Sequence, residues 1–510
     1  MFAKLNSVAV FGMETYLLQI EIDISNGLPA FDIVGLPDAS VKESRDRVRS
    51  ALKNCGFKFP PSRITVNLAP ADLKKEGPIY DLPILLAILL ATKQLSADVA
   101  DSAFIGEVSL DGNVRSVNGV LAMAICAKEN GIKKFFVPKE NAAEAAVVEG
   151  IEIYPVSTVK DLISHLNDEW EIEKAVPVKS EKSDNYVGLD FADVKGQTLA
   201  KRALEIAAAG GHNILLIGPP GSGKSMLAKR LPTILPEMTF EESIQTTKIH
   251  SIAGILDPEN PLITSRPFRS PHHTISAPGL TGGGAVPKPG EISLAHNGVL
   301  FLDELPEFHR DVMEAMRQPI DDGKVTISRV AGTLTYPSSV TFVAAMNPCP
   351  CGFFGHPTNR CICSPNAVQK YLNRISGPML DRLDLHIEVP PVDYTSLNSN
   401  APQETSAQIR KRVNAARAVQ TQRYVGTGIT CNARLTPALM KKHCVLNDAA
   451  SQILKAAFDK LGMSARAYDR ILKVARTIAD LGGCETIDAA HIAEAIQFRS
   501  LDRKYWGNQE

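Results

Sequence analysis

The sequence predicts an α/β protein in which a phosphate-loop core is preceded by an α+β domain and followed by a helical bundle. Three observations support this prediction. A glycine-rich loop follows the apolar run 214–217, an acidic pair follows the apolar run 299–302, and helical periodicity dominates beyond about residue 391. At 510 residues, the chain is also too long for one hydrophobic core. We therefore divide it into an N-terminal domain at 1–170, a linker at 171–186, an ATPase core at 187–390 and a C-terminal helical domain at 391–510.

The composition argues against several classes of protein. Lys and Arg total 55 against 56 Asp and Glu, so any contact with a polyanion must be local. The longest apolar run, 84–91, is too short to cross a bilayer, and residues 1–11 alternate like a strand and lack the pattern of a secretion signal. The nine cysteines favour reduced thiols or metal ligands over a disulfide framework. We therefore expect a cytoplasmic protein without membrane contact.

The N-terminal region alternates between strand and helix patterns. They predict strands within 7–24 and at 64–68, and helices at 81–91, 119–130 and 142–149. The polar stretch that follows can bury little surface, which is typical of a linker.

The segment from Gly218 to Ser225 has the phosphate-binding pattern GxxxxGK(S/T). Glycines in such a loop let backbone N–H groups surround phosphates, Lys224 reaches the outer two, and the Ser225 hydroxyl ligates magnesium. An apolar strand before the loop and helix-forming residues after it give the required context. The sequence therefore predicts a site for ATP and Mg²⁺ made by Gly218, Pro219, Pro220, Gly221, Ser222, Gly223, Lys224, Ser225 and Met226.

Asp303 and Glu304 follow four apolar residues, which places them at the carboxyl end of a buried strand. A carboxylate at Asp303 can hold the magnesium ion from the side opposite Ser225. A site that only binds nucleotide gains nothing from a second carboxylate, whereas a hydrolase needs one to polarise the attacking water. We therefore predict an ATPase with Glu304 as its general base.

The C-terminal region has the periodicity of a helical bundle. It predicts helices at 406–424, 437–443, 448–461, 466–481 and 488–498. Asp488 suits a helix start, and Gly482 with Gly483 suits a helix stop.

Asn347 follows an apolar strand, as Asp303 does. The stretch 191–197 (FADVKGQ), the phosphate loop, the acidic strand end and Asn347 occur in the order and spacing of AAA+ ATPases, which this region resembles. The resemblance implies that Asn347 orients the attacking water together with Glu304. Without it, Asn347 would be better interpreted as a turn residue before Pro348.

Further strings extend the resemblance over nearly the whole chain: RSPHHTIS, NGVLFLDE, NPCPCG, RISGPMLDRLDL and SARAYDR. Together they resemble the YifB/ComM family of magnesium-chelatase-like AAA+ ATPases. The resemblance implies a homohexameric ring in the presence of ATP and DNA, with Arg382 as a finger that reaches the neighbouring subunit's γ-phosphate. It also implies that Arg466 is the second sensor of a C-terminal lid, with Arg470 as the alternative. From the residues alone, each arginine could equally form a surface ion pair.

The family also implies a function. ComM-type members are hexameric DNA helicases that promote branch migration while incoming DNA is recombined during natural transformation, with recombination proteins as further partners. The alternative is a chelatase-like motor that remodels a protein partner for metal insertion. A partner would then have to supply the integrin-type metal-binding domain that this sequence lacks.

Two insertions distinguish this ATPase. One lies before the Asp303 strand and contains RPFRSPHH (266–273), and the other is a predicted β-hairpin over 324–336. In the related chelatase and MCM branch, such insertions project into the pore of the ring. Phosphate contacts need only positive charge and donors, so the DNA-binding candidates are Arg266, Arg269, His272, His273, Lys324 and Arg329. Alternatively, the histidines order the loop and Arg329 caps a surface hairpin.

Two CxC pairs, Cys349 with Cys351 and Cys361 with Cys363, surround a short loop. Four thiols suit a tetrahedral zinc ion, and four protein ligands would make the site structural. Because CxC is less common than CxxC in zinc sites, reduced thiols packed in the loop are an equal alternative.

The N-terminal region resembles the protease domain of Lon through 76–78, 106–120 and 136–141, which implies a fold of the ribosomal S5 domain 2-like type. In Lon, a serine follows the Gly-Pro pair and a lysine follows the later turn. Ile79 and Leu121 stand at these places. A Ser-Lys mechanism needs a hydroxyl beside an amine. We therefore expect a non-proteolytic module that binds or assembles.

Overall fold

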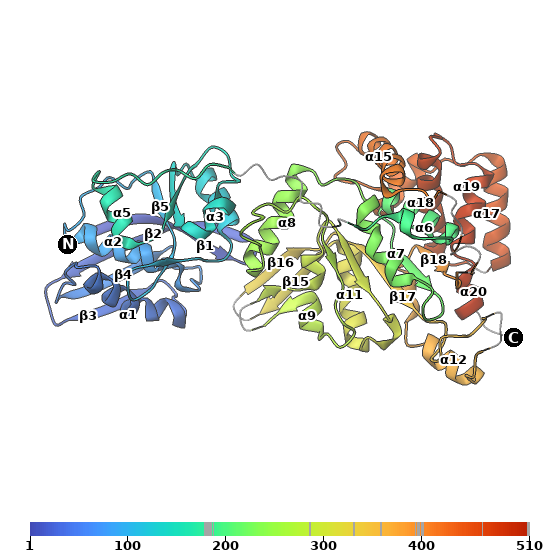
Figure 1. The fold of residues 1–510 in the computed structure, drawn as a ribbon, viewed down its shortest axis with the longest axis horizontal. Helices are drawn as coiled ribbons and strands as arrows, with labels where there is room; N and C mark the ends of the chain where they lie inside the picture. The colour runs from blue at the N-terminus through green and yellow to red at the C-terminus, as the bar shows by residue number, and fades with distance from the viewer. Residues whose placement is uncertain are drawn as a thin grey trace.

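The computed structural model describes residues 1–177, 186, 188–284, 287–329, 332–356, 360–392, 394, 398, 402–461 and 463–506, without the side chains at 329, 332, 461, 502 and 503. Residues 178–185, half of the predicted linker 171–186, thus lie outside the described residues. The molecule is elongated, with the N-terminal domain at one end, the parallel sheet in the middle and the C-terminal helices at the other end (Figure 1).

A mixed seven-stranded sheet forms the N-terminal domain, in the order β3-β4-β2-β1-β5-β8-β9. Its strands are β1 (Phe2–Phe11), β2 (Glu14–Ser25), β3 (Ala30–Val34), β4 (Arg63–Ala69), β5 (Ser102–Phe104), β8 (Lys134–Pro138) and β9 (Glu152–Val156). Its helices are α1 (Ala39–Asn54), α2 (Asp81–Ala91), α3 (Val120–Glu129), α4 (Ala142–Ala145) and α5 (Val159–Leu166). The apolar run at 84–91 is a buried core helix, as predicted. The helix predicted at 142–149 is wrong in length, because it ends where the β-branched Val147 and Val148 begin.

The middle of the molecule contains a five-stranded parallel sheet in the order β11-β14-β17-β10-β18. Its strands are β11 (Phe268–Arg269), β14 (Val299–Leu302), β17 (Thr341–Met346), β10 (Ile214–Ile217) and β18 (Leu385–Glu388). β10 comes first in the sequence and lies between two later strands, so the chain order reverses beside it. In parallel α/β sheets, ligands bind at the carboxyl ends of the strands near such a reversal.

Helices and two hairpins surround this sheet. The helices are α6 (Thr198–Gly210), α7 (Lys224–Arg230), α8 (Phe240–Ala253), α9 (Ala277–Thr281), α10 (Glu291–Leu294), α11 (Arg310–Asp322), α12 (Pro365–Leu372) and α13 (Gly377–Leu380). One hairpin pairs β12 (Gly282–Gly283) with β13 (Lys288–Pro289). The other pairs β15 (Lys324–Arg329) with β16 (Gly332–Pro337), which confirms the hairpin predicted there.

The C-terminal helices are α15 (Ser406–Arg423), α16 (Pro437–His443), α17 (Asp448–Leu461), α18 (Ala465–Leu481), α19 (Ala489–Gln497) and α20 (Leu501–Trp506). The first five contribute to the hydrophobic cluster on one face of the sheet, whereas Tyr505 of α20 belongs to the cluster on the other face. Alternate residues of β10 face opposite sides, so Leu216 shares a hydrophobic cluster with Ile471 of α18 and Leu215 belongs to the other cluster. Asp488 caps α19 through a capping box, as predicted.

The N-terminal domain contacts the core mainly through α3 and α8, which lie side by side in Figure 1. The Gly119 N–H donates to the Ser251 carbonyl oxygen at 3.2 Å, and the Ser251 hydroxyl donates to the buried carboxylate of Glu144. The β1–β2 turn touches the long hairpin, since a Cβ on Gly12 would lie 2.7 Å from Leu334 Cδ2. None of the helices in the described part of the chain combines the length and apolarity needed to span a membrane.

Candidate active site

The predicted strand, loop and helix around the phosphate-binding pattern are confirmed. β10 ends at Ile217, the loop runs from Gly218, and α7 begins at Lys224. Gly218 has no room for a side chain, because a Cβ there would lie 2.2 Å from the Val389 carbonyl oxygen of the neighbouring strand connection. Gly223 caps α7 with φ +92°, a conformation that favours glycine. The loop therefore has the backbone freedom and the helix N-terminus that an anion-binding loop requires.

The Lys224 ammonium group lies at the centre of the site. It donates to the carbonyl oxygens of Gly218 and Pro219 at 2.7 and 2.9 Å and to Asn347 Oδ1 at 3.2 Å. Burial lowers the pKa of Lys224, while the carboxylates of Asp303 and Glu304 raise it in opposition. A cation held between the loop and the strand ends can contact phosphate oxygens there.

Two oxygen ligands for a divalent cation meet beside Lys224. The Ser225 hydroxyl at the start of α7 donates to Asp303 Oδ2 at 2.6 Å, and Asp303 follows the last residue of β14. A hydroxyl and a carboxylate are the hard donors that Mg²⁺ takes from a protein. The donor set at Ser225 and Asp303 therefore fits magnesium.

Glu304 has a constrained backbone and an exposed carboxylate. Its φ is +54°, and its N–H donates to Asp303 Oδ1 at 3.0 Å. The side chain is 55% exposed, so a water molecule can reach it. Asn347 follows β17, and its amide oxygen already meets Lys224, so the Asn347 side chain and the loop share one polar cluster.

His273 lies beside Glu304, which the sequence did not predict. Its Nδ1 is 3.6 Å from Glu304 Oε2. The register explains the meeting, because Arg269 of β11 pairs with Leu300 of β14, and His273 and Glu304 each come four residues after this pair in the chain. A contact across 31 residues leaves no local sequence signal. His273 also stacks on His272, with ring centroids 4.1 Å apart.

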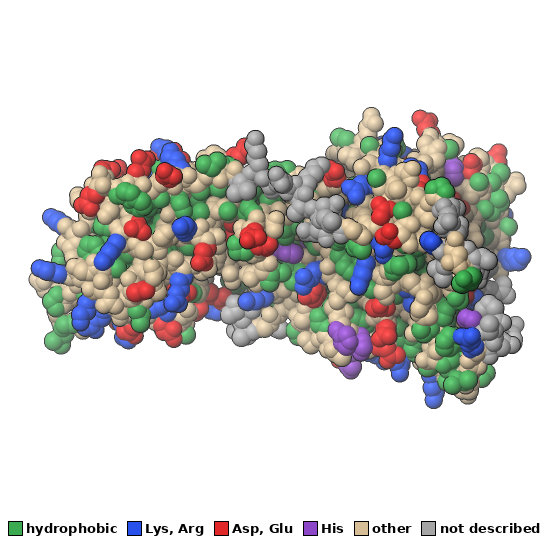
Figure 2. All heavy atoms as spheres, in the orientation of Figure 1, with side chains coloured by type: hydrophobic (Ala, Val, Ile, Leu, Met, Phe, Trp, Pro, Cys, Tyr) green, Lys and Arg blue, Asp and Glu red, His purple; other side chains and the backbone are tan. Residues whose placement is uncertain are grey.

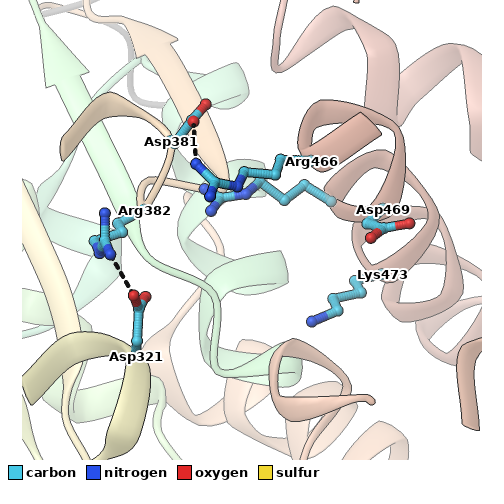
Figure 3. A pocket seen from close by; sticks show the side chains of 7 residues that line it. Asp321, Asp381, Arg382, Arg466, Asp469 and Lys473 are labelled. Carbon is cyan, nitrogen blue, oxygen red and sulfur yellow. Dashed lines mark hydrogen bonds and ion pairs between the residues drawn. The ribbon is translucent and has the colours of Figure 1, made fainter. Parts of the chain in front are cut away.

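The two arginines assigned to γ-phosphate sensing lie together and away from the loop. Arg382 follows α13 and forms an ion pair with Asp321, while Arg466 at the start of α18 pairs with Asp381 at 3.4 Å (Figure 3). Arg466 is 72% exposed. Among the described residues, no part of the phosphate loop lines the pocket that holds them, which is made by Asp321, Asp381, Arg382, Arg466, Asp469, Arg470 and Lys473.

Arg470, the alternative second sensor, is more enclosed than Arg466. It lies 3.8 Å from Asp384 Oδ1, and burial lowers its pKa. Its side chain is only 18% exposed. Arg466 is therefore the better placed of the two to reach outside its own chain.

The predicted DNA-binding residues lie in different surroundings. Arg266 donates to carbonyl oxygens of Pro236, Glu237 and Asn297 and to Glu242, and Arg269 forms two bonds to Glu291 at 2.7 Å. These two guanidinium groups are therefore engaged within the chain.

The remaining candidates are closer to the surface. His272 is exposed and contacts Thr274 at 2.9 Å, and Lys324 is exposed at the base of the long hairpin. The side chain of Arg329 lies outside the described residues. Figure 2 shows basic and acidic side chains interspersed over this face, in keeping with the near-zero net charge.

The four cysteines of the two CxC pairs converge. Their sulfur atoms all lie within 4.8 Å of one another. Cys349 Sγ lies 3.3 Å from Cys351 Sγ and 3.7 Å from Cys361 Sγ, and the latter two sulfurs are 3.6 Å apart. Ligands at about 2.3 Å from a tetrahedral zinc ion are about 3.8 Å apart. The cluster therefore has the size and donor type of a metal site.

A cavity beside the phosphate loop was missed at the sequence level. It is lined by Gly196, Gln197, Thr198, Leu199, Glu388, Pro390, Pro391 and Val392. Gln197 Nε2 donates to the Ser222 carbonyl oxygen at 3.3 Å and to that of Pro390. Because this cavity adjoins the loop, it can receive the nucleoside part of a nucleotide.

In the N-terminal domain, the positions that correspond to the Lon nucleophile and base are apolar and enclosed. Ile79 lies in a short 3₁₀ turn (Pro78–Tyr80), and Leu121 is fully buried near the start of α3. The Leu121 N–H donates to Glu144 Oε1 at 2.8 Å. A hydroxyl and an amine are thus absent from both described positions.

Comparisons with known proteins agree with this architecture. The family model of magnesium chelatase subunit ChlI matches residues 190–397, that of subunit ChlI of Mg-chelatase matches 20–141, and that of the ChlI C-terminal part matches 403–499. The chain is 47% identical to the competence protein ComM of Haemophilus influenzae over 98% of this chain and 97% of that protein. It is 43% identical to the uncharacterized protein YifB of Escherichia coli over 97% and 96%. It is also 27% identical to Lon protease 2 of Bacillus subtilis over 32% of each chain.

Proposed function

Because the chain belongs to the ComM/YifB family of magnesium-chelatase-like AAA+ ATPases, we propose that it is a ring-forming, ATP-dependent DNA translocase that promotes branch migration during recombination of incoming DNA. One observation carries the proposal most directly. The loop, the two carboxylates and Asn347 meet at one edge of the sheet, whereas Arg382 and Arg466 share a different pocket. A hydrolysis site assembled from two copies of the chain needs this separation.

In the proposed site, each residue has one task. Lys224 and the loop amides would bind the phosphates, and Ser225 and Asp303 would hold Mg²⁺, which would supply neutralising charge to the phosphate groups. Glu304 accepts the proton of the attacking water, and Asn347 orients that water. His273, in the segment that follows β11, positions the Glu304 carboxylate.

The neighbouring subunit supplies the remaining charges. Arg382 would move from Asp321 to the γ-phosphate of the adjacent copy, where an arginine finger contributes to the transition state. Arg466 is 72% exposed, and we propose that it exchanges Asp381 for the same neighbouring nucleotide. A head-to-tail contact of this kind generates a ring when the rotation between copies closes, and we propose that it closes as a homohexamer.

DNA is the proposed substrate of movement. The support is the competence protein ComM, which is 47% identical to this chain, together with the exposed Lys324, His272 and the hairpin end at Arg329. We also propose that the four-cysteine cluster holds one structural zinc ion, since its sulfur spacing fits tetrahedral thiolate ligation.

The direct test is ATP hydrolysis with and without single-stranded and forked DNA. We expect stimulation by DNA, and low-resolution images with a slowly hydrolysed ATP analogue should show six subunits around a DNA-containing pore. A protein assembled as a ring whose ATPase rate ignores every DNA form would contradict the proposal.

Charge reversal separates DNA translocation from chelatase-like remodelling of a protein partner. Arg329→Glu should weaken DNA binding because it opposes the phosphate charge. Arg45→Glu makes the same charge change on the exposed surface of α1 and should leave DNA binding unchanged. Equal DNA affinity in Arg329→Glu and the unaltered protein would favour the remodelling motor.

A further inference from the structure

The cysteine loop lies directly on the phosphate loop. Gly352, next to Cys351, has φ +85°, and a Cβ added there would lie 2.5 Å from Pro220 Cδ and 2.8 Å from Pro220 Cγ. Pro220 is the third residue of the phosphate-binding pattern. The backbone of the cysteine loop therefore rests on the ring of Pro220 without a side chain between them.

One backbone hydrogen bond and one hydrogen bond to a sulfur atom hold the turn that makes this contact. The Gly352 N–H donates to the Cys349 carbonyl oxygen at 2.9 Å, and the Phe354 N–H donates to Cys349 Sγ at 3.3 Å. A metal ion bound by Cys349 and Cys351 would connect both ends of this turn to Cys361 and Cys363 on the returning segment. Metal binding by four dispersed ligands orders the segments that carry them.

The same cluster also restrains the other side of the nucleotide site. Asn347 is two residues before Cys349, and its amide oxygen accepts from the Lys224 ammonium at 3.2 Å. The cluster is therefore linked to the nucleotide site at two places, through Asn347 and through the contact of Gly352 with Pro220. Only a few backbone torsions separate the cysteines from each of these places.

The far end of the cysteine loop is anchored as well. Ser364, which follows Cys363, caps α12 by accepting from the Ala367 N–H at 3.3 Å. The Trp506 indole donates to the Leu372 carbonyl oxygen of α12 at 3.3 Å. The segment that carries Cys361 and Cys363 is therefore held in place by α12. A metal ion bound by all four cysteines would restrain the turn at Gly352 relative to this fixed segment.

We propose that metal occupancy of this cluster controls nucleotide binding at the phosphate loop. The inference rests on the proposed zinc site and the proposed ATP site. With zinc bound, the cysteine loop holds Pro220 and Asn347 in the positions that accept a nucleotide. When zinc is removed, the turn at Gly352 loosens and the affinity for nucleotide falls.

The test uses the full-length protein and a fluorescent ATP analogue. Elemental analysis should give one zinc ion per chain. Removal of zinc with a chelator under reducing conditions should raise the Kd for the analogue by about tenfold or more, since small displacements of a binding loop have effects of this size. Adding Zn²⁺ back should restore the Kd, and adding Mg²⁺ alone should not.

Variants separate metal loss from loop displacement. Cys361→Ser should lose zinc and nucleotide affinity together. Gly352→Ala should keep zinc and still bind the analogue more weakly, because the added methyl group collides with Pro220. Cys484→Ser removes an exposed cysteine outside the cluster and should change neither property.

Each result decides a different part of the inference. Unchanged nucleotide affinity after complete and reversible zinc removal would overturn it and leave the ATPase proposal intact. A protein that takes up no zinc would also overturn it. A zinc-loaded protein that does not bind the analogue at all would instead contradict the proposed ATP site, and the inference would fall with it.

Discussion

The helices α3 and α7 begin in the same way, but their surroundings differ. A glycine with left-handed backbone precedes each helix, Gly119 with φ +83° and Gly223 with φ +92°. The first-turn N–H groups of a helix favour an anion. At α3 the anion is the chain's own Glu144 carboxylate, which accepts from the Leu121 N–H. At α7 the first turn instead carries Lys224 and joins the phosphate loop.

The side chains around the N-termini of α3 and α7 thus give these two helix ends different roles. Glu144 also accepts from the Ser251 hydroxyl of α8, so the start of α3 is part of the contact between the N-terminal domain and the core. Burial raises the pKa of Glu144, and its hydrogen bonds from Ser251 and Leu121 oppose that shift. The N-terminal domain thus uses its helix start for a contact within the chain, while the helix start of the AAA+ core carries the side chains of the proposed nucleotide site.

The largest expected effect comes from Arg382→Ala. If ATP hydrolysis depends on the AAA+ core and not on the N-terminal domain, this change should lower the ATPase rate of the assembled ring by about 10³-fold or more. Arginine fingers contribute to kcat by factors of this size. Nucleotide affinity should persist, because Arg382 lies outside the pocket of its own phosphate loop. Steady-state hydrolysis and analogue binding measure the two quantities.

The matched change in the other domain is Arg63→Ala, which removes an exposed ion pair with Asp32. It should alter hydrolysis less than twofold. Comparable losses in both variants would mean that general destabilisation explains the Arg382 result.

The next largest effect should separate Glu304 of the core from Glu144 of the N-terminal domain by their influence on the ATPase rate. Glu304→Gln removes the proposed general base and should slow hydrolysis by about 10²- to 10⁴-fold while preserving ATP binding. Glu144→Gln keeps an acceptor at the start of α3 and should leave the ATPase rate near that of the unaltered protein. Hydrolysis in Glu304→Gln at the normal rate would refute the assignment.

A smaller effect should separate two adjacent histidines. His273→Ala removes the side chain 3.6 Å from Glu304 and should lower kcat about tenfold, equivalent to the loss of one charge-assisted contact. His272→Ala should change kcat less than twofold, since His272 is exposed and contacts Thr274. If instead both changes weaken DNA binding equally and spare kcat, the histidines belong to the DNA interface.

Ser251→Ala tests the docking contact at α3. Loss of a hydrogen bond to the buried Glu144 should cost about 1–3 kcal/mol of unfolding free energy, because the carboxylate keeps fewer donors. Calorimetry should show the loss, and the ATPase rate per folded ring should stay the same. An ATPase defect without a stability change would mean that this contact transmits movement to the active site.

No effect at all is expected for proteolysis. Incubation with casein and ATP should yield no cleavage, because Ile79 and Leu121 supply neither a nucleophile nor an amine. Cleavage that survives removal of contaminating proteases would restore the enzymatic interpretation of the N-terminal domain.

Local patterns predicted much of the fold. The helices at 437–443 and 448–461 have the predicted bounds, and β10 and α7 flank the phosphate loop as expected. Periodicity, caps and glycine positions are encoded within a few residues, so they can be read directly. The length of α4 was overestimated. The high helix propensity of its alanine-rich run predicts a longer helix than the structure shows.

The site was predictable where one segment carries the information. Ser225 and Asp303 meet as expected, since Asp303 follows one buried strand, the loop before Ser225 follows another, and parallel strands end at one edge of the sheet. The meeting of His273 with Glu304 and the engagement of Arg266 within the chain were not predictable, because both depend on register and on distant partners. The same holds for Gly352 on Pro220.

The central claim is that each hydrolysis site combines the loop and Glu304 of one chain with Arg382 of the next. Mixing Glu304→Gln with Arg382→Ala tests it directly, because each variant is expected to hydrolyse ATP very slowly alone but keeps the residue that the other lacks. We predict that the mixture regains a substantial fraction of the ATPase rate when rings form with DNA. A mixture in which both variants co-assemble and hydrolysis remains at the level of the separate variants would contradict the claim.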